Sequence, residues 1–96
     1  PNFFAALNNK GLVLDKLGKH EEAIEAYNKS IQTNPAFDAA WFNKACAYAL
    51  LRDKDKMLSS LKKAIDLNPR YKMALQQIPD FEGYRNDPDF IRLTGR

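Results

Sequence analysis

Three prolines of this chain stand at intervals of 34 residues, and this periodicity constrains the fold more than any other feature of the sequence. Each is followed two positions later by an aromatic residue, and the three pairs are Pro1 and Phe3, Pro35 and Phe37, and Pro69 and Tyr71. Equal units of this length are typical of structural repeats, which bury their apolar faces only by stacking on one another. The sequence therefore predicts a stack of similar units.

Within the first unit, apolar residues recur at helical spacing over residues 4–17 and again over 21–31. Gly18 suits the turn between these helices because it has no Cβ. Asn34 is expected to end the second helix, because a residue before proline avoids the helical region. No segment has the alternation of a strand, so the sequence predicts an all-α fold of helix hairpins.

The second unit repeats this pattern, with helices expected over residues 38–51 and 54–67 and with Asp53 as the N-cap between them. A shift of the sequence by one proline interval also aligns identical residues, which are Ala5 with Ala39, Ala6 with Ala40, Asn9 with Asn43, Lys10 with Lys44, Leu17 with Leu51, Lys29 with Lys63, Ile31 with Ile65 and Asn34 with Asn68. Such matches along the helix faces indicate that both units follow the same packing rules.

These positions resemble the tetratricopeptide repeat, in which small, large apolar and aromatic residues occupy fixed places on two helices and a proline closes the unit. In the first unit the pattern falls on Leu7, Gly11, Leu14, Ala23, Tyr27, Ser30 and Pro35, and in the second on Trp41, Ala45, Tyr48, Met57, Leu61, Ala64 and Pro69. Leu14 and Leu61 stand where the family has aromatics, and Met57 where it has alanine. The resemblance implies a right-handed solenoid of antiparallel helix pairs, in which Gly11 and Ala45 let the helices of a pair approach closely.

The resemblance covers residues 1–78, divided into 4–37, 38–71 and a partial third unit from 72. A helix that begins at Arg70 cannot continue past Ile78, because Pro79 lacks a backbone N–H. Residues 79–96 are similar to the capping module that ends some arrays, and the residues expected to cover the last repeat are Phe81, Tyr84, Phe90 and Leu93. The alternative is a frayed tail, because Gly83 and two prolines weaken helix formation.

Pro1 stands where the closing proline of an earlier repeat would stand, so we expect the chain to be a fragment of a longer array. Phe4 is unusual in this position, because its counterparts Asp38 and Lys72 are polar. We therefore predict that Phe3 and Phe4 contact an upstream repeat or a second copy of the chain.

The resemblance also implies a binding site, since the first helices of such arrays line a concave groove that holds a peptide or helix of another protein. By position, the groove residues are expected to be Ala5, Asn8, Asn9, Leu12, Asp15, Lys16, Ala39, Phe42, Asn43, Cys46, Ala49, Met73, Gln76 and Gln77. Asn9 and Asn43 either hydrogen-bond a ligand backbone or simply tolerate a half-exposed position. Phe42 is either an apolar contact for the ligand or ordinary core against Met73 or Gln77.

Some members of the family grip chaperone C-terminal carboxylates through lysines, asparagines and an arginine. The corresponding residues here are Asn8, Leu12, Asn43, Met73 and Gln77, of which only Asn43 fits. Without cations nothing offsets the desolvation of a carboxylate, so this ligand class is not expected.

Several other functions are excluded by the residues present. His20 and Cys46 lie in different units, and a single His and a single Cys cannot build a catalytic pair or a tetrahedral metal site. The glycines stand alone and form no phosphate loop, so we expect no enzyme activity, metal or cofactor. The net charge of +3 is mixed with acids, which argues against a nucleic-acid footprint. No apolar run reaches the ~20 residues of a membrane span, and one cysteine is compatible with the cytoplasm.

One helix is conspicuously basic, and its cations are Arg52, Lys54, Lys56, Lys62 and Lys63. They form either a solvated face or a docking surface for an acidic partner. The sequence as a whole predicts a cytoplasmic scaffold for protein–protein interaction that presents a rigid groove to a peptide or helix. The alternatives are a substrate-recruiting segment of a larger enzyme and a weak nucleic-acid binder.

Overall fold

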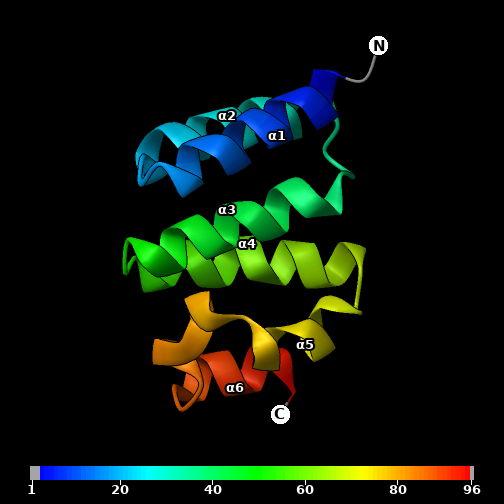
Figure 1. Ribbon diagram of the computed structural model, residues 1–96. Helices are drawn as coiled ribbons and strands as arrows, with labels where there is room; N and C mark the ends of the chain where they lie inside the picture. The colour runs from blue at the N-terminus through cyan, green and yellow to red at the C-terminus, as the bar shows by residue number, and fades with distance from the viewer. Residues whose placement is uncertain (1–2, 96) are drawn as a thin grey trace.

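A computed structural model describes residues 3–95, and every regular element in that range is helical (Figure 1). The elements are α1 Phe3–Lys16, α2 His20–Thr33, α3 Asp38–Leu50, α4 Lys54–Leu67, α5 Tyr71–Ala74, the 3₁₀ helices η1 Leu75–Gln77 and η2 Pro79–Tyr84, and α6 Pro88–Thr94. The predicted all-α fold of stacked helix pairs is confirmed. No helix within these residues is long and apolar enough to cross a membrane.

The helices form a stack with two layers (Figure 1). α1 pairs with α2, α3 pairs with α4, and α2 packs against α3 to join the first two units. In the first layer α1 also contacts α3 and α3 contacts η2, whereas in the second layer α4 contacts α6. The stack is 39 Å long and 26 × 21 Å across. Its consecutive first helices lie side by side along one face, because α1 contacts α3 and α3 contacts η2.

The turn inside each helix pair has the same geometry in both units. Gly18 and Arg52, which hold equivalent places in the two units, have positive φ angles of 80° and 61°. Four backbone bonds close the two turns, from Gly18 to Asp15 (2.9 Å), Lys19 to Leu14 (2.9 Å), Arg52 to Ala49 (3.1 Å) and Asp53 to Tyr48 (3.0 Å). In this pattern the backbone N–H groups of the turn bond to the last carbonyls of the first helix, and one turn residue must adopt a left-handed conformation. Glycine adopts this conformation without strain, whereas arginine does not.

The helices of the first pair approach most closely at Gly11. A Cβ added there would lie 2.6 Å from Cδ1 of Tyr27, a distance that no ordinary contact allows. The corresponding pair in the second unit is Ala45 and Leu61, both fully buried. The helices of each pair therefore approach closely through a small residue opposite a large one, which is Gly11 opposite Tyr27 in the first unit and Ala45 opposite Leu61 in the second.

The third unit keeps the register of the first two, although its first helix is divided. Residues 72–84 correspond to α3 but lie in α5, η1 and η2, because Ile78 before Pro79 is extended, with φ −96° and ψ 116°. α6 begins at Pro88, which holds the place in the third unit that Lys54, the start of α4, holds in the second. An aspartate caps both helices, since Asp53 accepts from the N–H of residue 56 at 3.3 Å and Asp87 accepts from that of residue 89 at 2.9 Å.

The main core lies between the second and third units. Phe81 and Phe90 are essentially fully buried there, and their rings are 5.8 Å apart. The Nζ of Lys54 lies 2.8 Å from a carboxylate oxygen of Asp87 and 2.9 Å from one of Asp89, so charged contacts also join α4 to the start of α6. Residues 79–95 therefore pack on the second unit through two aromatic rings and an ion-pair cluster.

Phe4 has a local contact that the sequence did not predict. Its ring meets that of Phe37 edge-on, with centroids 4.9 Å apart, and its carbonyl accepts a bond from the Ser30 hydroxyl at 2.7 Å. Phe3 is 64% exposed. Pro1, on which the expected truncation of a longer array rests, lies outside the described residues.

Candidate partner-binding face

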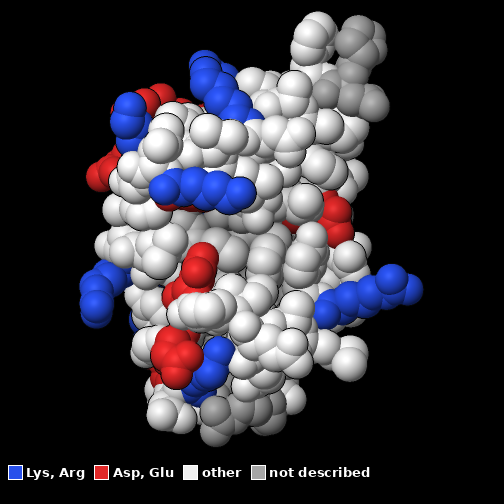
Figure 2. Space-filling model, viewed as in Figure 1, with Lys and Arg blue, Asp and Glu red and all other residues white. Residues whose placement is uncertain are grey.

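The predicted groove residues lie on α1, α3 and residues 71–84, and we call the surface of these segments the first-layer face. Figure 2 shows the molecule from the viewpoint of Figure 1, with acidic and basic side chains interspersed and much of the surface uncharged. No single sign of charge dominates this view. A ligand on this side would have to be recognised by shape and hydrogen bonding more than by net charge.

Asn8 and Asn43 join the first two units. The Nδ2 of Asn43 donates to Oδ1 of Asn8 at 3.1 Å, across 35 residues of sequence. Asn8 is buried and Asn43 is half-buried. The side-chain oxygen of Asn43 has no protein partner among residues 3–95, whereas Asn9 is exposed.

Asp15 has two partners within its own helix pair. The hydroxyl of Tyr27 donates to Oδ2 at 2.5 Å, and Nδ1 of His20 lies 2.8 Å from Oδ1. Burial raises the pKa of the Tyr27 phenol far above its ordinary value, and the bond to Asp15 raises it further. The carboxylate of Asp15 therefore orients Tyr27 and His20 rather than facing a ligand with free oxygens.

Phe42 lies in the core between the second and third units. It is 9% exposed, and its ring stacks on Tyr71 with centroids 4.3 Å apart and planes 9° from parallel. Phe81 contacts the same ring at a centroid distance of 6.0 Å. This placement corresponds to the core alternative stated for Phe42, although its aromatic partners are Tyr71 and Phe81 rather than Met73 or Gln77.

Cys46 lies on α3, Asp80 on η2 and Asp15 on α1 of the first-layer face. Burial raises the pKa of the Cys46 thiol well above its usual range, and the charges of Asp80 and Asp15 add to this effect. The thiol is thus protonated and unreactive at neutral pH. Burial also raises the pKa of the Asp80 carboxyl, with Asp15 adding to the shift and His20 opposing it.

The other predicted groove residues are more accessible. Leu12 is half-buried and Lys16 is exposed on α1, while Met73 is 80% exposed and Gln77 is exposed on α5 and η1. The structure therefore brings Asn8, Asn43, Asp15 and Cys46 into contact with other parts of the protein, and leaves the side chains at 9, 16, 73 and 77 open to solvent.

A cavity of about 300 Å³ lies at one end of the first-layer face, where α3 meets η2. It is lined by Ala49, Leu50, Arg52, Pro79, Asp80, Gly83 and Tyr84. Of these, only Ala49 was among the predicted groove residues. Leu50 is 46% exposed and corresponds to Lys16 in the first unit. An apolar residue at a position that is charged in the first unit is the sequence feature that could have indicated this cavity.

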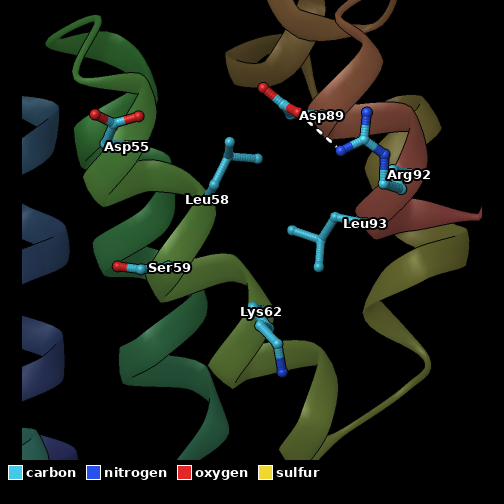
Figure 3. Close-up of a pocket in the computed structure, with 7 residues that line it drawn as sticks. All are labelled: Asp55, Leu58, Ser59, Lys62, Asp89, Arg92 and Leu93. Atoms are coloured by element: carbon cyan, nitrogen blue, oxygen red, sulfur yellow. Dashed lines mark ion pairs between the residues drawn. The ribbon is translucent and has the colours of Figure 1, made fainter.

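A larger open groove of about 570 Å³ lies in the second layer, between α4 and α6 (Figure 3). Leu58 and Leu93 face each other across it, and the guanidinium of Arg92 lies 3.3 Å from the Asp89 carboxylate at its rim. The sequence did not predict this groove, because it depends on how the shortened α6 rests on α4. Within the described residues no three potential metal ligands come together.

Comparison with known proteins gives a consistent family assignment. Two family models described as tetratricopeptide repeat match residues 4–37 and 38–71. Human mitochondrial import receptor subunit TOM70 is 36% identical over 75 residues, which are 73% of this chain and 12% of the receptor subunit. Human protein O-mannosyl-transferase TMTC3 is 32% identical over 76 residues, covering 78% of this chain and 8% of the transferase.

A third relative is tetratricopeptide repeat protein 36 of Caenorhabditis elegans, which is 34% identical over 71 residues, or 73% of this chain and 40% of that protein. This chain thus spans a minor part of each of these relatives. No solved structure matches it significantly.

Proposed function

Because this chain belongs to the tetratricopeptide repeat family, we propose that its first-layer face holds a peptide or helical segment of a partner protein. Family members serve as protein–protein interaction modules, and the finer assignment concerns where on this chain the partner lies. The observation that carries it is the cavity between α3 and η2, since it lies on this face and contains an exposed apolar side chain, Leu50.

The chemistry of the face favours a segment without net charge. The amides of Asn9 and Gln77 are exposed and can pair with a peptide backbone through both donors and acceptors. Leu50 offers apolar contact in the cavity, and the Asp80 carboxylate beside it would favour a donor or cation from the ligand. Arg52 lines the same cavity, so its lining carries one acid and one base and does not favour a charged terminus of either sign.

Selection of binders from a displayed library of random peptides tests this proposal, followed by calorimetric titration of the best peptide. Leu50→Asp places a charge in the cavity and should weaken binding by about tenfold, which corresponds to about 1.4 kcal/mol. Leu67→Asp is the matched control, because Leu67 is 37% exposed at the end of α4 and lies outside the cavity between α3 and η2. Equal affinities of both variants and wild type would place the peptide elsewhere and overturn the proposal.

The similarity to the human transferase favours a second candidate, in which this segment recruits substrate for a catalytic domain on the same parent chain. This chain would still act by binding, and the same face would hold the substrate protein. A parent polypeptide without any catalytic domain would remove this candidate. Self-association through Phe3 is a further proposal, and a strictly monomeric mass in light scattering that Phe3→Ser leaves unchanged would argue against it.

A further inference from the structure

Three lysines of the second unit gather around two aromatic rings. Nζ of Lys44 lies 5.2 Å from the ring centroid of Trp41, Nζ of Lys63 lies 5.9 Å from the same ring, and Nζ of Lys56 lies 5.8 Å from that of Tyr48. We propose that these five residues, the lysine–aromatic surface, dock an acidic segment of a partner protein. This surface is separate from the cavity between α3 and η2, so the proposal does not depend on the one above.

These lysines have no carboxylate partner among residues 3–95. The two other lysines of α4 are paired, since Lys54 contacts Asp87 and Asp89, and Lys62 lies 3.0 Å from Asp66. Burial lowers the pKa of Lys44, and the nearby charge of Lys56 lowers it further. Lys44 is half-buried and near Lys56, so an external anion would offset both its desolvation and the repulsion between these two cations.

The first unit provides a natural comparison at the same positions. There the residues are Leu7, Lys10, Leu14, Glu22 and Lys29, in place of Trp41, Lys44, Tyr48, Lys56 and Lys63. All five line one small cavity of about 110 Å³, together with Glu25. At these positions the first unit has two lysines and, with Glu25, two acids. The second unit has three lysines and no acid, because Ser59 stands in the place of Glu25. The positive surface is a property of the second unit alone.

The geometry favours acidic side chains over nucleic acid. The ring of Trp41 is fixed by a bond from Nε1 to the Pro35 carbonyl at 2.9 Å, and two ammonium groups lie against it. A base could stack there only by displacing a lysine, whereas a carboxylate can approach the same lysines directly. Three cations also provide fewer phosphate contacts than the roughly six to ten that drive strong nucleic-acid binding.

The spacing of the lysines predicts the spacing of the acids. Lys56 and Lys63 are seven residues apart on α4, which places them on one side of the helix about 10 Å apart at 1.5 Å per residue. In an extended polyproline II peptide, which has three residues per turn and rises about 3.1 Å per residue, carboxylates three residues apart lie on the same side about 9 Å apart. The expected partner segment is therefore extended, with acidic residues at every third position.

Trp41 is the only tryptophan, so its fluorescence reports directly on this surface. The probe is a blocked heptapeptide with Glu at every third position and Gly or Ser between, and its control is the same peptide with Gln for Glu. The Glu peptide should alter the Trp41 emission saturably, with an affinity that falls as salt rises, and the Gln peptide should not. Equal responses to both peptides, or none to either, would overturn the proposal.

Matched variants locate the binding. Replacing Lys44, Lys56 and Lys63 together by Gln should weaken the Glu peptide by about tenfold, equivalent to about 1.4 kcal/mol. Replacing Lys10 and Lys29 by Gln is the control in the first unit and should leave the affinity unchanged. Circular dichroism checks that both variants remain folded. If an oligothymidylate of similar charge bound more tightly than the Glu peptide and lost its affinity in the triple variant, the surface would be a nucleic-acid site instead.

Discussion

Gly11→Ala is the substitution for which local and tertiary effects make opposite predictions. Gly11 lies inside α1, where alanine is favoured over glycine by about 1 kcal/mol because of backbone entropy. Judged on helix propensity alone, the variant should be more stable than wild type. The packing of α1 on α2 predicts the reverse.

The new methyl group would meet the ring of Tyr27 at 2.6 Å from Cδ1 and 2.8 Å from Cζ, so the ring or the helix must move by about 1 Å to restore normal contact. Tyr27 cannot yield easily, because it is fully buried and its hydroxyl donates to Asp15 at 2.5 Å. Overpacking of this kind costs about 1–3 kcal/mol, and a weakened bond to a charged acceptor adds about 1 kcal/mol. After the gain in helix propensity, we expect a net loss of about 2 kcal/mol.

Urea and thermal unfolding followed by circular dichroism measure this loss, which for a chain of this size corresponds to a fall in Tm of about 10 °C. The decisive comparison uses Tyr27→Leu, which recreates the combination of Ala45 and Leu61 found in the second unit. In that background Gly11→Ala should stabilise, by about 1 kcal/mol, because the smaller side chain leaves room for the methyl group. If Gly11→Ala changed stability by the same amount in both backgrounds, the close approach to Tyr27 would not be the reason that glycine is required.

Two further predictions concern backbone strain and acidity. Arg52→Gly should stabilise the protein by about 0.5–1 kcal/mol in urea unfolding, because Arg52 has a φ of 61° that glycine adopts without strain, while Gly18→Arg should destabilise it; a loss of stability in Arg52→Gly would contradict this reasoning. Asp80→Asn should raise Tm at pH 7, because folding raises the pKa of the Asp80 carboxyl above its value in the unfolded chain. The protonated carboxyl favours folding fully below the unfolded pKa, and this contribution is lost as the pH rises through the folded pKa. At pH 7 the ionised carboxylate therefore destabilises wild type, and the neutral amide does not. The gain should disappear when the pH is lowered below about 4, and a difference between variant and wild type that does not depend on pH would exclude titration of Asp80 as its cause.

The helix pairs could be predicted from the sequence because local rules determine them. Proline closes each unit, Gly18 and Asp53 fit the turns, and apolar residues recur at helical spacing, so the expected bounds of the first four helices differ from the observed ones by at most two residues. The same interval of 34 residues also separates Asp53 from Asp87, the N-caps of α4 and α6. It shows that α6 begins where the second helix of a third unit would begin. This correspondence is present in the sequence beside the similarity of residues 79–96 to a capping module, which stays a prediction.

The predicted groove residues were harder to place, because their surroundings depend on contacts between distant segments. Asn43 bonds to Asn8 across the first two units, and no local pattern distinguishes such a bond from a pair of free amides. Phe42 is covered by the rings of Tyr71 and Phe81, which come from the third unit. The sequence left two roles open for Phe42, because no local pattern shows which distant rings meet it.

The differences between the two complete units separate packing from recognition. In the interior, a change at one position is matched by a change at its neighbour, since Gly11 with Tyr27 becomes Ala45 with Leu61 and the combined volume stays similar. At the surface compensation is incomplete, because Asp53 replaces Lys19 where Lys56 replaces Glu22, but Ser59 replaces Glu25 and leaves one acid fewer. Folding requires the first kind of change to be balanced and does not require the second kind at all. An unbalanced charge on an otherwise matched repeat therefore favours a partner that supplies the opposite charge. This is the reason that we place the partner on the lysine–aromatic surface rather than on the better packed parts of the second unit.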